Sequence, residues 1–425
     1  MKQKLVVLSL VLICVSVTGC AVRVLPVVSA STAYISSPML TKISVAATKT
    51  PTSTIVPSPA ITPTPFPTLN FVPSGKIIYN GGKIIYADGS RIATLLMPLK
   101  PASSPSPLDI AEVGAWNFHW SNDGKYLAFQ CVDKPFGGEL NVCILDMKYL
   151  KIGDSEHLLD YLKIARLYRV GKVEGISFGP FLGSLSWSPD NKYVGVAIIG
   201  AVESPCIIEA QTGDFDCSTS NMLRTGLSAD DLNLLSSSRS FVLSWSSKNI
   251  NHLVFASQQN RLFLLDLQNK SIDTIWSPPG NGEIDYEQIP VWSSDGKKIT
   301  FVYTEGEKQG ANWVAQNYVI GRIDDDGSNY ERLIDGKEVY NQIVGMIPEE
   351  YRGGNFELHI SSWSPDGRFL LFVVYMNKKG VDPATYGNPD VFTSGMFYLD
   401  TKTGAVIPLN VDFSNPHGYS PDWGQ

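Results

Sequence analysis

The chain has 425 residues, 44% of them hydrophobic and 18% charged, with a formal net charge of −7 at pH 7. Five basic residues and no acidic residue precede residue 74, so the remainder of the chain carries −12. This composition indicates a folded, net-negative protein and argues against general binding to nucleic acid or to anionic membrane surfaces. Cations, basic partners and neutral ligands remain compatible with it.

Residues 1–20 predict an export signal. Lys2 and Lys4 precede an apolar run over residues 5–15, which ends in the sequence Val17-Thr18-Gly19-Cys20. This segment resembles a bacterial lipoprotein signal, and the resemblance implies that Cys20 becomes a lipidated first residue. The protein is then expected in the cell envelope, held at the membrane by its N-terminal lipid with the rest of the chain extracytoplasmic. A transmembrane anchor and a plain secretory signal are the alternatives, although the apolar run is short for a membrane span.

Residues 21–73 are predicted to be a disordered tether. Pro, Ser and Thr dominate from residue 48 onward. Such a segment cannot bury a core and favours extended conformations. We therefore expect the folded domain to cover residues 74–425.

One phrase recurs along residues 74–425. A tryptophan is followed by Ser-x-Asp-Gly-Lys, or a close variant, and then by a short apolar stretch; Lys248-Asn249 replaces Asp-Gly in the third copy. Asp and Gly favour a tight turn, the apolar stretch favours a strand, and a second hairpin follows in each unit. Recurrent units of four antiparallel strands predict a β-propeller, with each tryptophan packed as an apolar plate between neighbouring blades. The six tryptophans are Trp120, Trp187, Trp245, Trp292, Trp363 and Trp423.

The two ends of this region complement each other. Residues 418–425 form a first strand with nothing after it, and residues 74–79 form a second strand with nothing before it. Joining them restores the recurrent phrase. We therefore predict an all-β protein: a six-bladed β-propeller of four-stranded antiparallel blades, closed by pairing of the C-terminal strand with the N-terminal strands, which removes the exposed sheet edge.

The recurrent phrase resembles the Trp-Ser-Pro-Asp-Gly-Lys repeat of TolB-type six-bladed propellers over about residues 74–425. The resemblance implies the fold more than the function, because this propeller serves periplasmic partner-binding proteins, lids of prolyl oligopeptidases and some sugar-acting enzymes. TolB itself has an extra N-terminal domain where this chain has a tether. An envelope-integrity role is therefore one alternative among several.

Four cysteines follow Cys20. Cys131 and Cys143 lie on consecutive predicted strands, and Cys206 and Cys217 flank a predicted turn. Both pairs can face each other across a hairpin, so we predict two disulfides in this exported chain. Free buried cysteines are the alternative.

The catalytic and metal-binding patterns in the sequence are weak. The Gly-x-Ser-x-Gly string around Ser177 lacks the following helix that a nucleophile elbow requires. The acidic run that begins at Asp324 has the wrong spacing for a calcium loop and favours a hairpin turn. The five histidines show no ligand spacing. We therefore predict no catalytic residue, no metal site and no cofactor.

Insertions fall mainly in one class of connection, those that join the second strand to the third and the fourth strand to the next blade. They cover residues 133–139, 226–239, 277–287, 305–312, 335–356 and 376–393. Long loops on one face of a rigid scaffold often carry function, so we predict that this face binds an unknown protein or small ligand. The candidate residues are Tyr286, Trp313, Tyr351, Tyr386, Glu283, Asp285 and Glu305. The alternatives are loops that only cap the channel, and an enzyme that acts on a carbohydrate or peptide at the channel mouth.

Overall fold

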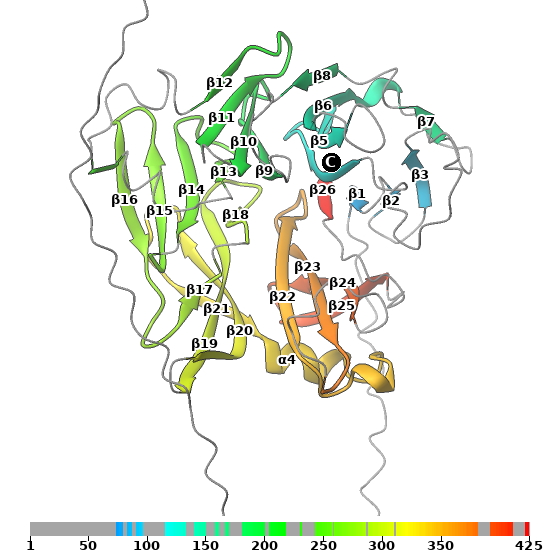
Figure 1. Cartoon of the computed structure of the whole chain (residues 1–425), viewed down its shortest axis with the longest axis vertical. Helices are drawn as coiled ribbons and strands as arrows, with labels where there is room; N and C mark the ends of the chain where they lie inside the picture. The colour runs from blue at the N-terminus through cyan, green and yellow to red at the C-terminus, as the bar shows by residue number, and fades with distance from the viewer. Residues whose placement is uncertain are drawn as a thin grey trace, which may run out of the picture. The chain divides into compact units, whose positions relative to one another are not determined.

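The computed structural model describes residues 74–79, 83–86, 91–96, 115–132, 140–149, 158–160, 166–169, 181–199, 204–217, 230–231, 243–257, 259–285, 288–309, 312–380, 392–410 and 421–424. All of these belong to the second of two compact units, Met1–Ile61 and Thr62–Gln425. They form a mainly-β propeller with antiparallel blades (Figure 1). Among them, no helix is long and apolar enough to cross a membrane. Cys20, the predicted signal and the whole predicted tether lie outside the described residues.

Four blades each contain four antiparallel strands in hydrogen-bonded order. The first blade consists of β4 (Ala115–Trp120), β5 (Tyr126–Val132), β6 (Leu140–Asp146) and β8 (Arg166–Arg169), with the 3-10 helix η3 (Met147–Tyr149) after β6. The next consists of β9 (Phe181–Trp187), β10 (Tyr193–Ile199), β11 (Ser204–Glu209) and β12 (Phe215–Cys217). The third is built from β13 (Leu243–Trp245), β14 (His252–Ser257), β15 (Arg261–Asp266) and β16 (Ser271–Trp276). Another contains β22 (Phe356–Trp363), β23 (Phe369–Asn377), β24 (Phe392–Asp400) and β25 (Ala405–Asn410).

The blade between β16 and β22 is larger. Its strands are β17 (Glu283–Ile284), β18 (Val291–Trp292), β19 (Lys298–Gln309), β20 (Asn312–Asp324) and β21 (Glu331–Asp335). Both β17 and β18 pair with β19. The helix α4 (Gly336–Ile343) and the 3-10 helix η4 (Glu349–Tyr351) follow β21.

A further sheet joins the two ends of the described chain. It has the order β26 (Asp422–Gly424), β1 (Lys76–Tyr79), β2 (Lys83–Tyr86), β3 (Arg91–Leu96) and β7 (Leu158–Asp160). The predicted terminal pairing is confirmed, because Ile77 is the register partner of Trp423. The inner strands contact one another in the order β4, β9, β13, β18, β22, β26 and back to β4.

The recurrent phrase builds its turn through side-chain hydrogen bonds. After Trp120, the Ser121 hydroxyl donates to the Asp123 carboxylate (2.8 Å) and accepts from the Tyr126 N–H (2.9 Å). The same carboxylate accepts from the Lys125 N–H (3.1 Å), and Gly124 between them has φ +67°, a left-handed conformation that glycine adopts without strain. The same serine–aspartate pair recurs at 188/190, 293/295 and 364/366.

The tryptophans pack between blades, as predicted. Trp187 stacks on Tyr126 of the preceding blade with ring centroids 6.1 Å apart, and Trp245 stacks on Tyr193 at 6.4 Å. The Trp187 Nε1–H also donates to the His119 carbonyl oxygen of the preceding blade at 2.9 Å. The Trp187 indole therefore combines apolar burial with a directional contact across the seam, and the Trp292 Nε1–H does the same with the Ser244 carbonyl oxygen at 3.1 Å.

Three features correct the sequence predictions. Residues 305–312 are not a loop: β19 and β20 continue pairing to Gln309↔Asn312 beyond a bulge at Glu305/Gly306, which satisfies their own backbone groups. The blades are not uniformly four-stranded, since β7 adds to β3 in parallel and β17 adds to β19.

The fold is also not purely β, because α4 begins with a capping box between Asp335 and Glu338. The side chain of Gln342 on α4 then covers the edge strand β25. It donates to the Gly404 carbonyl oxygen (3.0 Å) and accepts from the Val406 N–H (2.8 Å). These contacts block an edge that could otherwise pair with another strand.

Candidate functional site

The inner strands end around one cavity of about 250 Å³. Each strand contributes its tryptophan and the residue before it, so the recurrent phrase supplies most of the wall. All six repeat tryptophans line the cavity, and each is only 4–6% exposed. The sequence predicts that these indoles pack between blades, and the structure adds that they also contribute to the wall of this cavity.

At three seams, the side chain of the residue before the tryptophan links neighbouring blades. The Ser186 hydroxyl accepts the Trp245 N–H (2.7 Å), and the Ser362 hydroxyl accepts the Trp423 N–H (2.8 Å). At the seam between β26 and β4, the acceptor is a carboxylate instead: Asp422 Oδ2 accepts the Trp120 N–H at 2.6 Å. The residue before the tryptophan therefore joins the blades at these seams and also lines the cavity. Among the six copies of this position, the acid is Asp422.

His119 and Asp422 meet at this seam. Their Nδ1 and Oδ2 atoms are 3.9 Å apart, and their side chains are 22% and 10% exposed. Burial lowers the pKa of His119 to about 4, so the imidazole is neutral at pH 7. Burial raises the pKa of Asp422 to about 7, against the opposing hydrogen bonds from the Trp120 N–H, Ser362 and the Trp423 N–H.

The rest of the wall is mostly polar and uncharged. Apart from His119 and Asp422, the titratable residue in the lining is Lys248, which lies in the turn after Trp245. Serine side chains contribute much of the polar surface: Ser121, Ser186, Ser244, Ser247, Ser294, Ser361 and Ser362. Within the described part of the chain, the buried Nε1 atoms of Trp120 and Trp363 have no hydrogen-bond partner.

Three of the predicted acidic candidates gather at one end of the large blade. Glu283 on β17 is exposed and pairs in register with Thr304, the neighbour of Glu305. Glu305 accepts from Arg332 at 2.9 Å. Asp285 follows β17, and its carboxylate accepts from the Gln288 side chain at 2.6 Å.

Of the predicted aromatic candidates, Tyr351 is the one whose side chain the structure describes. It lies on η4, is 9% exposed and belongs to a core cluster, with Lys378 5.5 Å from its ring centroid. The ring therefore packs in the core rather than lying open at a binding face. Trp313 lies on β20 opposite Lys308, and its side chain is outside the described part of the structure. Tyr286 and Tyr386 also lie outside it, as does Ser177.

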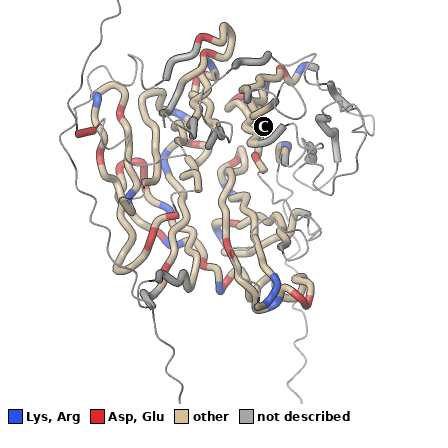
Figure 2. The backbone as a smooth tube through the Cα atoms, in the orientation of Figure 1, with Lys and Arg blue, Asp and Glu red and all other residues tan. Residues whose placement is uncertain are grey.

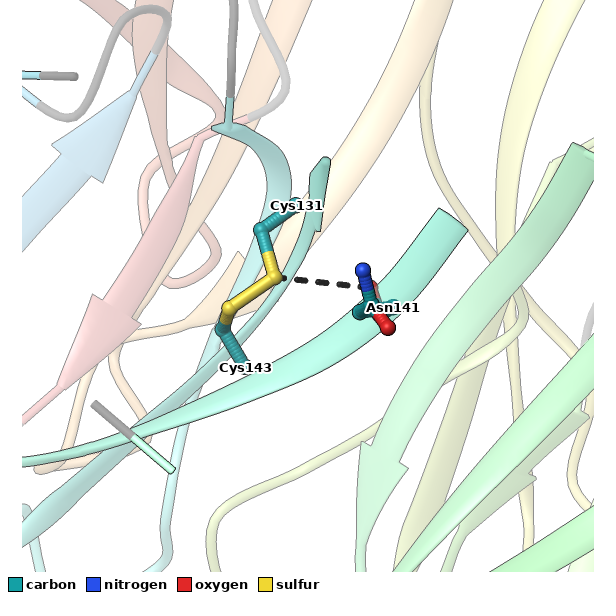
Figure 3. The surroundings of a disulfide bond; sticks show 3 residues. All are labelled: Cys131, Asn141 and Cys143. Atoms are coloured by element: carbon teal, nitrogen blue, oxygen red, sulfur yellow. Dashed lines mark hydrogen bonds between the residues drawn. A yellow bond between two sulfur atoms is a disulfide. The ribbon is translucent and has the colours of Figure 1, made fainter. Parts of the chain in front are cut away.

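One predicted disulfide is present. Cys131 and Cys143 are bonded across β5 and β6 with Cα atoms 6.0 Å apart, and both are fully buried. Cys131 Sγ lies 3.7 Å from the Asn141 carbonyl oxygen (Figure 3). Cys206 and Cys217 are backbone register partners, but their side chains are not described, so this second disulfide stays a prediction.

The acidic run at Asp324 forms a turn with internal contacts. Asp324 pairs with Lys298 and accepts from Asn329, while Asp326 accepts the Ser328 N–H. Among the residues that the structure describes, no group of three or more His, Cys, Asp and Glu could hold a metal ion. Acidic and basic residues are scattered over the blades (Figure 2).

No protein-family model and no curated protein matches this sequence. TolB from Acinetobacter baumannii is similar in structure, with 14% identity, a TM-score of 0.38, and coverage of 68% of this chain and 53% of its own. An oligogalacturonate lyase from Vibrio parahaemolyticus has 12% identity and a TM-score of 0.35, covering 68% and 76%. A puromycin-hydrolyzing peptidase of Mycobacterium tuberculosis has 13% identity and a TM-score of 0.38, covering 70% and 38%.

The similarity to TolB and to other β-propellers is therefore a distant structural one. The chain spans about half the length of the TolB chain that it matches.

Proposed function

We propose that the chain is a cell-envelope lipoprotein, anchored through Cys20, whose propeller is a binding scaffold for a protein or ligand. The ring has six blades in this proposal, the sixth being the sheet that contains β26 and β1. The cyclic contacts among the six inner strands support this number. The hydrogen bond from the Trp120 N–H to Asp422, which spans 302 positions in the sequence, supports closure.

One observation carries the binding role: the additions to the large blade occur in one class of connection, whereas β7 lies between β6 and β8 of another blade. The extension of the β19–β20 hairpin lies between the second and third strands of its blade. Strand β17 and helix α4 lie in the connections that lead into and out of the same blade. Because strands alternate in direction, these connections share one end of the blades, opposite the Ser-x-Asp-Gly turns.

The chemistry of this end favours a basic or hydrogen-bonding partner. Glu283 is exposed there, and Glu305 is 38% exposed while it holds Arg332. Carboxylates at a surface bring specificity and faster association with a positively charged partner. A rigid blade that fixes both groups lowers the entropic cost of binding.

Photo-crosslinking of the full-length protein in its native envelope tests this proposal. A photoreactive residue in place of Trp313, at the extended hairpin, is expected to trap a partner. The matched control replaces Asp295, an exposed turn residue at the other end of the same blade. Adducts from position 295 but not from position 313 would place the partner at the Ser-x-Asp-Gly end of the blades and contradict the proposal. Turnover of an added glycan or peptide would instead favour the enzyme alternative.

A further inference from the structure

The central cavity contains a carboxyl group that lacks a cationic partner in the described part of the structure. Three strands pack against β26, and the titratable residues they carry are His119 on β4, Lys76 and Tyr79 on β1, and Glu357 and His359 on β22. Only His119 lies within ion-pair distance of Asp422, and it is neutral at pH 7 because burial lowers its pKa. A buried carboxylate without a cation is costly, so this site favours either a proton or a cationic ligand.

The lining suits an ammonium group better than a bare metal ion. Seven serines contribute to it, and hydroxyl oxygens accept from ammonium N–H groups. Among the described residues, no group of three or more His, Cys, Asp and Glu could hold a metal ion. Asp422 Oδ2 and the neutral imidazole of His119 supply acceptors for ammonium N–H groups.

We propose that this cavity binds a small primary amine that also carries a hydroxyl or carboxylate oxygen, with its ammonium group against Asp422. The volume of about 250 Å³ limits the ligand to a few heavy atoms, since drug-sized ligands occupy pockets of roughly 300–1,000 Å³. Lys248 in the same lining carries the opposite charge, which suits the oxygen end of an amino acid or amino alcohol. The site lies at the Ser-x-Asp-Gly end of the blades and is independent of the long-loop face proposed above.

Binding and protonation compete at Asp422. The amine requires the carboxylate form, so affinity is expected to fall about tenfold for each pH unit below the Asp422 pKa of about 7. The neutral His119 does not change this slope above pH 5, because its pKa is about 4. The pH profile therefore reports on Asp422.

Titration of the full-length protein with ethanolamine and with 4-aminobutyrate, followed by tryptophan fluorescence, tests the proposal. Saturable binding is expected for both amines at pH 8, and none for ethylene glycol, which lacks the ammonium group. Asp422→Asn retains an acceptor for the Trp120 N–H but removes the charge. It should weaken amine binding about 10- to 100-fold, the value of a charge-assisted hydrogen bond.

Asp273→Asn, an exposed position on the outer strand β16, is the matched control and should bind the amines as the unchanged protein does. Equal binding by Asp422→Asn, a larger loss in Asp273→Asn, or equal binding of ethylene glycol would each overturn the proposal. If Asp422→Asn does not fold, the unchanged protein decides the question. If neither amine then shows saturable binding, or if the affinity is constant from pH 5 to pH 8, the site is refuted.

Discussion

His119 and Asp422 show how a repeated position acquires a different chemistry. The equivalent residues in two other blades are the serines 186 and 362, which accept a neighbouring backbone N–H without a charge. At the terminal seam the acceptor is an acid, and the residue before Trp120 is a histidine 3.9 Å away. The two groups together hold one proton between about pH 4 and pH 6.5, whether the protein is folded or unfolded, because burial shifts their pKa values in opposite directions.

Single substitutions should show that His119 and Asp422 make opposite contributions to the pH dependence of stability. In His119→Gln, stability should fall as pH rises from about 4 to about 7, since folded Asp422 retains a proton that the unfolded chain releases near 3.8. In Asp422→Asn, stability should fall as pH drops from 6.5 towards 4, since the unfolded chain protonates His119 first. Each effect is up to about 3–4 kcal/mol, and urea unfolding at several pH values measures it. Parallel pH profiles for both variants would contradict the opposing shifts.

The Cys131–Cys143 disulfide should add moderate stability. It closes a short loop, with a sequence separation of 12, so the entropy model gives about 2–3 kcal/mol. Replacing both cysteines with alanine should lower the free energy of unfolding by that amount in urea titrations.

Peptide mapping without reduction, applied to the unchanged protein, should find Cys206 joined to Cys217 as well. Free thiols at 206 and 217 in protein taken from the envelope would end the second assignment.

At the scale of strands and turns, closure depends on close approach of the two chain ends. Gly75 has φ +105°, and a Cβ there would lie 2.4 Å from the Gly424 carbonyl oxygen and 2.7 Å from Trp423 Nε1. Gly353 also has positive φ, +78°, but a Cβ there would meet nothing within 4 Å. Comparing Gly75 with Gly353 separates backbone strain, which both positions share, from a steric clash between β1 and β26, which only Gly75 has.

Gly75→Ala should therefore destabilise the protein more than Gly353→Ala does. Both variants place alanine in a left-handed conformation, at roughly 1–2 kcal/mol. Only the first also forces β1 away from β26, which adds about 1–3 kcal/mol of overpacking. Urea unfolding compares them directly. Equal losses in the two variants would mean that the terminal pairing contributes little to stability.

The sequence allowed the blades to be predicted because each turn is encoded locally. Ser121 and Asp123 are two positions apart and bond to each other within the turn, although Asn122 between them also bonds to the next blade. Asp335 and Glu338 are a comparable local signal for α4, which the sequence predictions did not include. By contrast, β7 pairs with β3 and β17 pairs with β19 through backbone hydrogen bonds, and no distinctive side-chain pattern in these short strands indicates the pairing. The cavity needs residues from all six inner strands, which no local pattern places together.

At the scale of the whole molecule, the negative charge and the predicted membrane anchor lie in different parts of the chain. Residues 74–425 carry −12, and the five basic residues before them precede or lie within the predicted tether. A negative domain on such a tether is repelled by an anionic membrane surface, so charge does not hold it there. Membrane attachment then depends on the lipid predicted at Cys20.

Replacement of Cys20 tests this attachment. Cys20→Ala should abolish lipid labelling and either release the protein from the membrane fraction or leave its signal uncleaved, because the acylated residue is gone. Cys14→Ala is the matched control, since Cys14 lies in the apolar run of the same signal. It should retain both labelling and membrane association. The propeller should fold in both variants, and unfolding in urea checks this. Unchanged lipid labelling in Cys20→Ala would refute the anchor, and membrane retention of a cleaved, unlabelled protein would require another attachment, such as binding through the long-loop face.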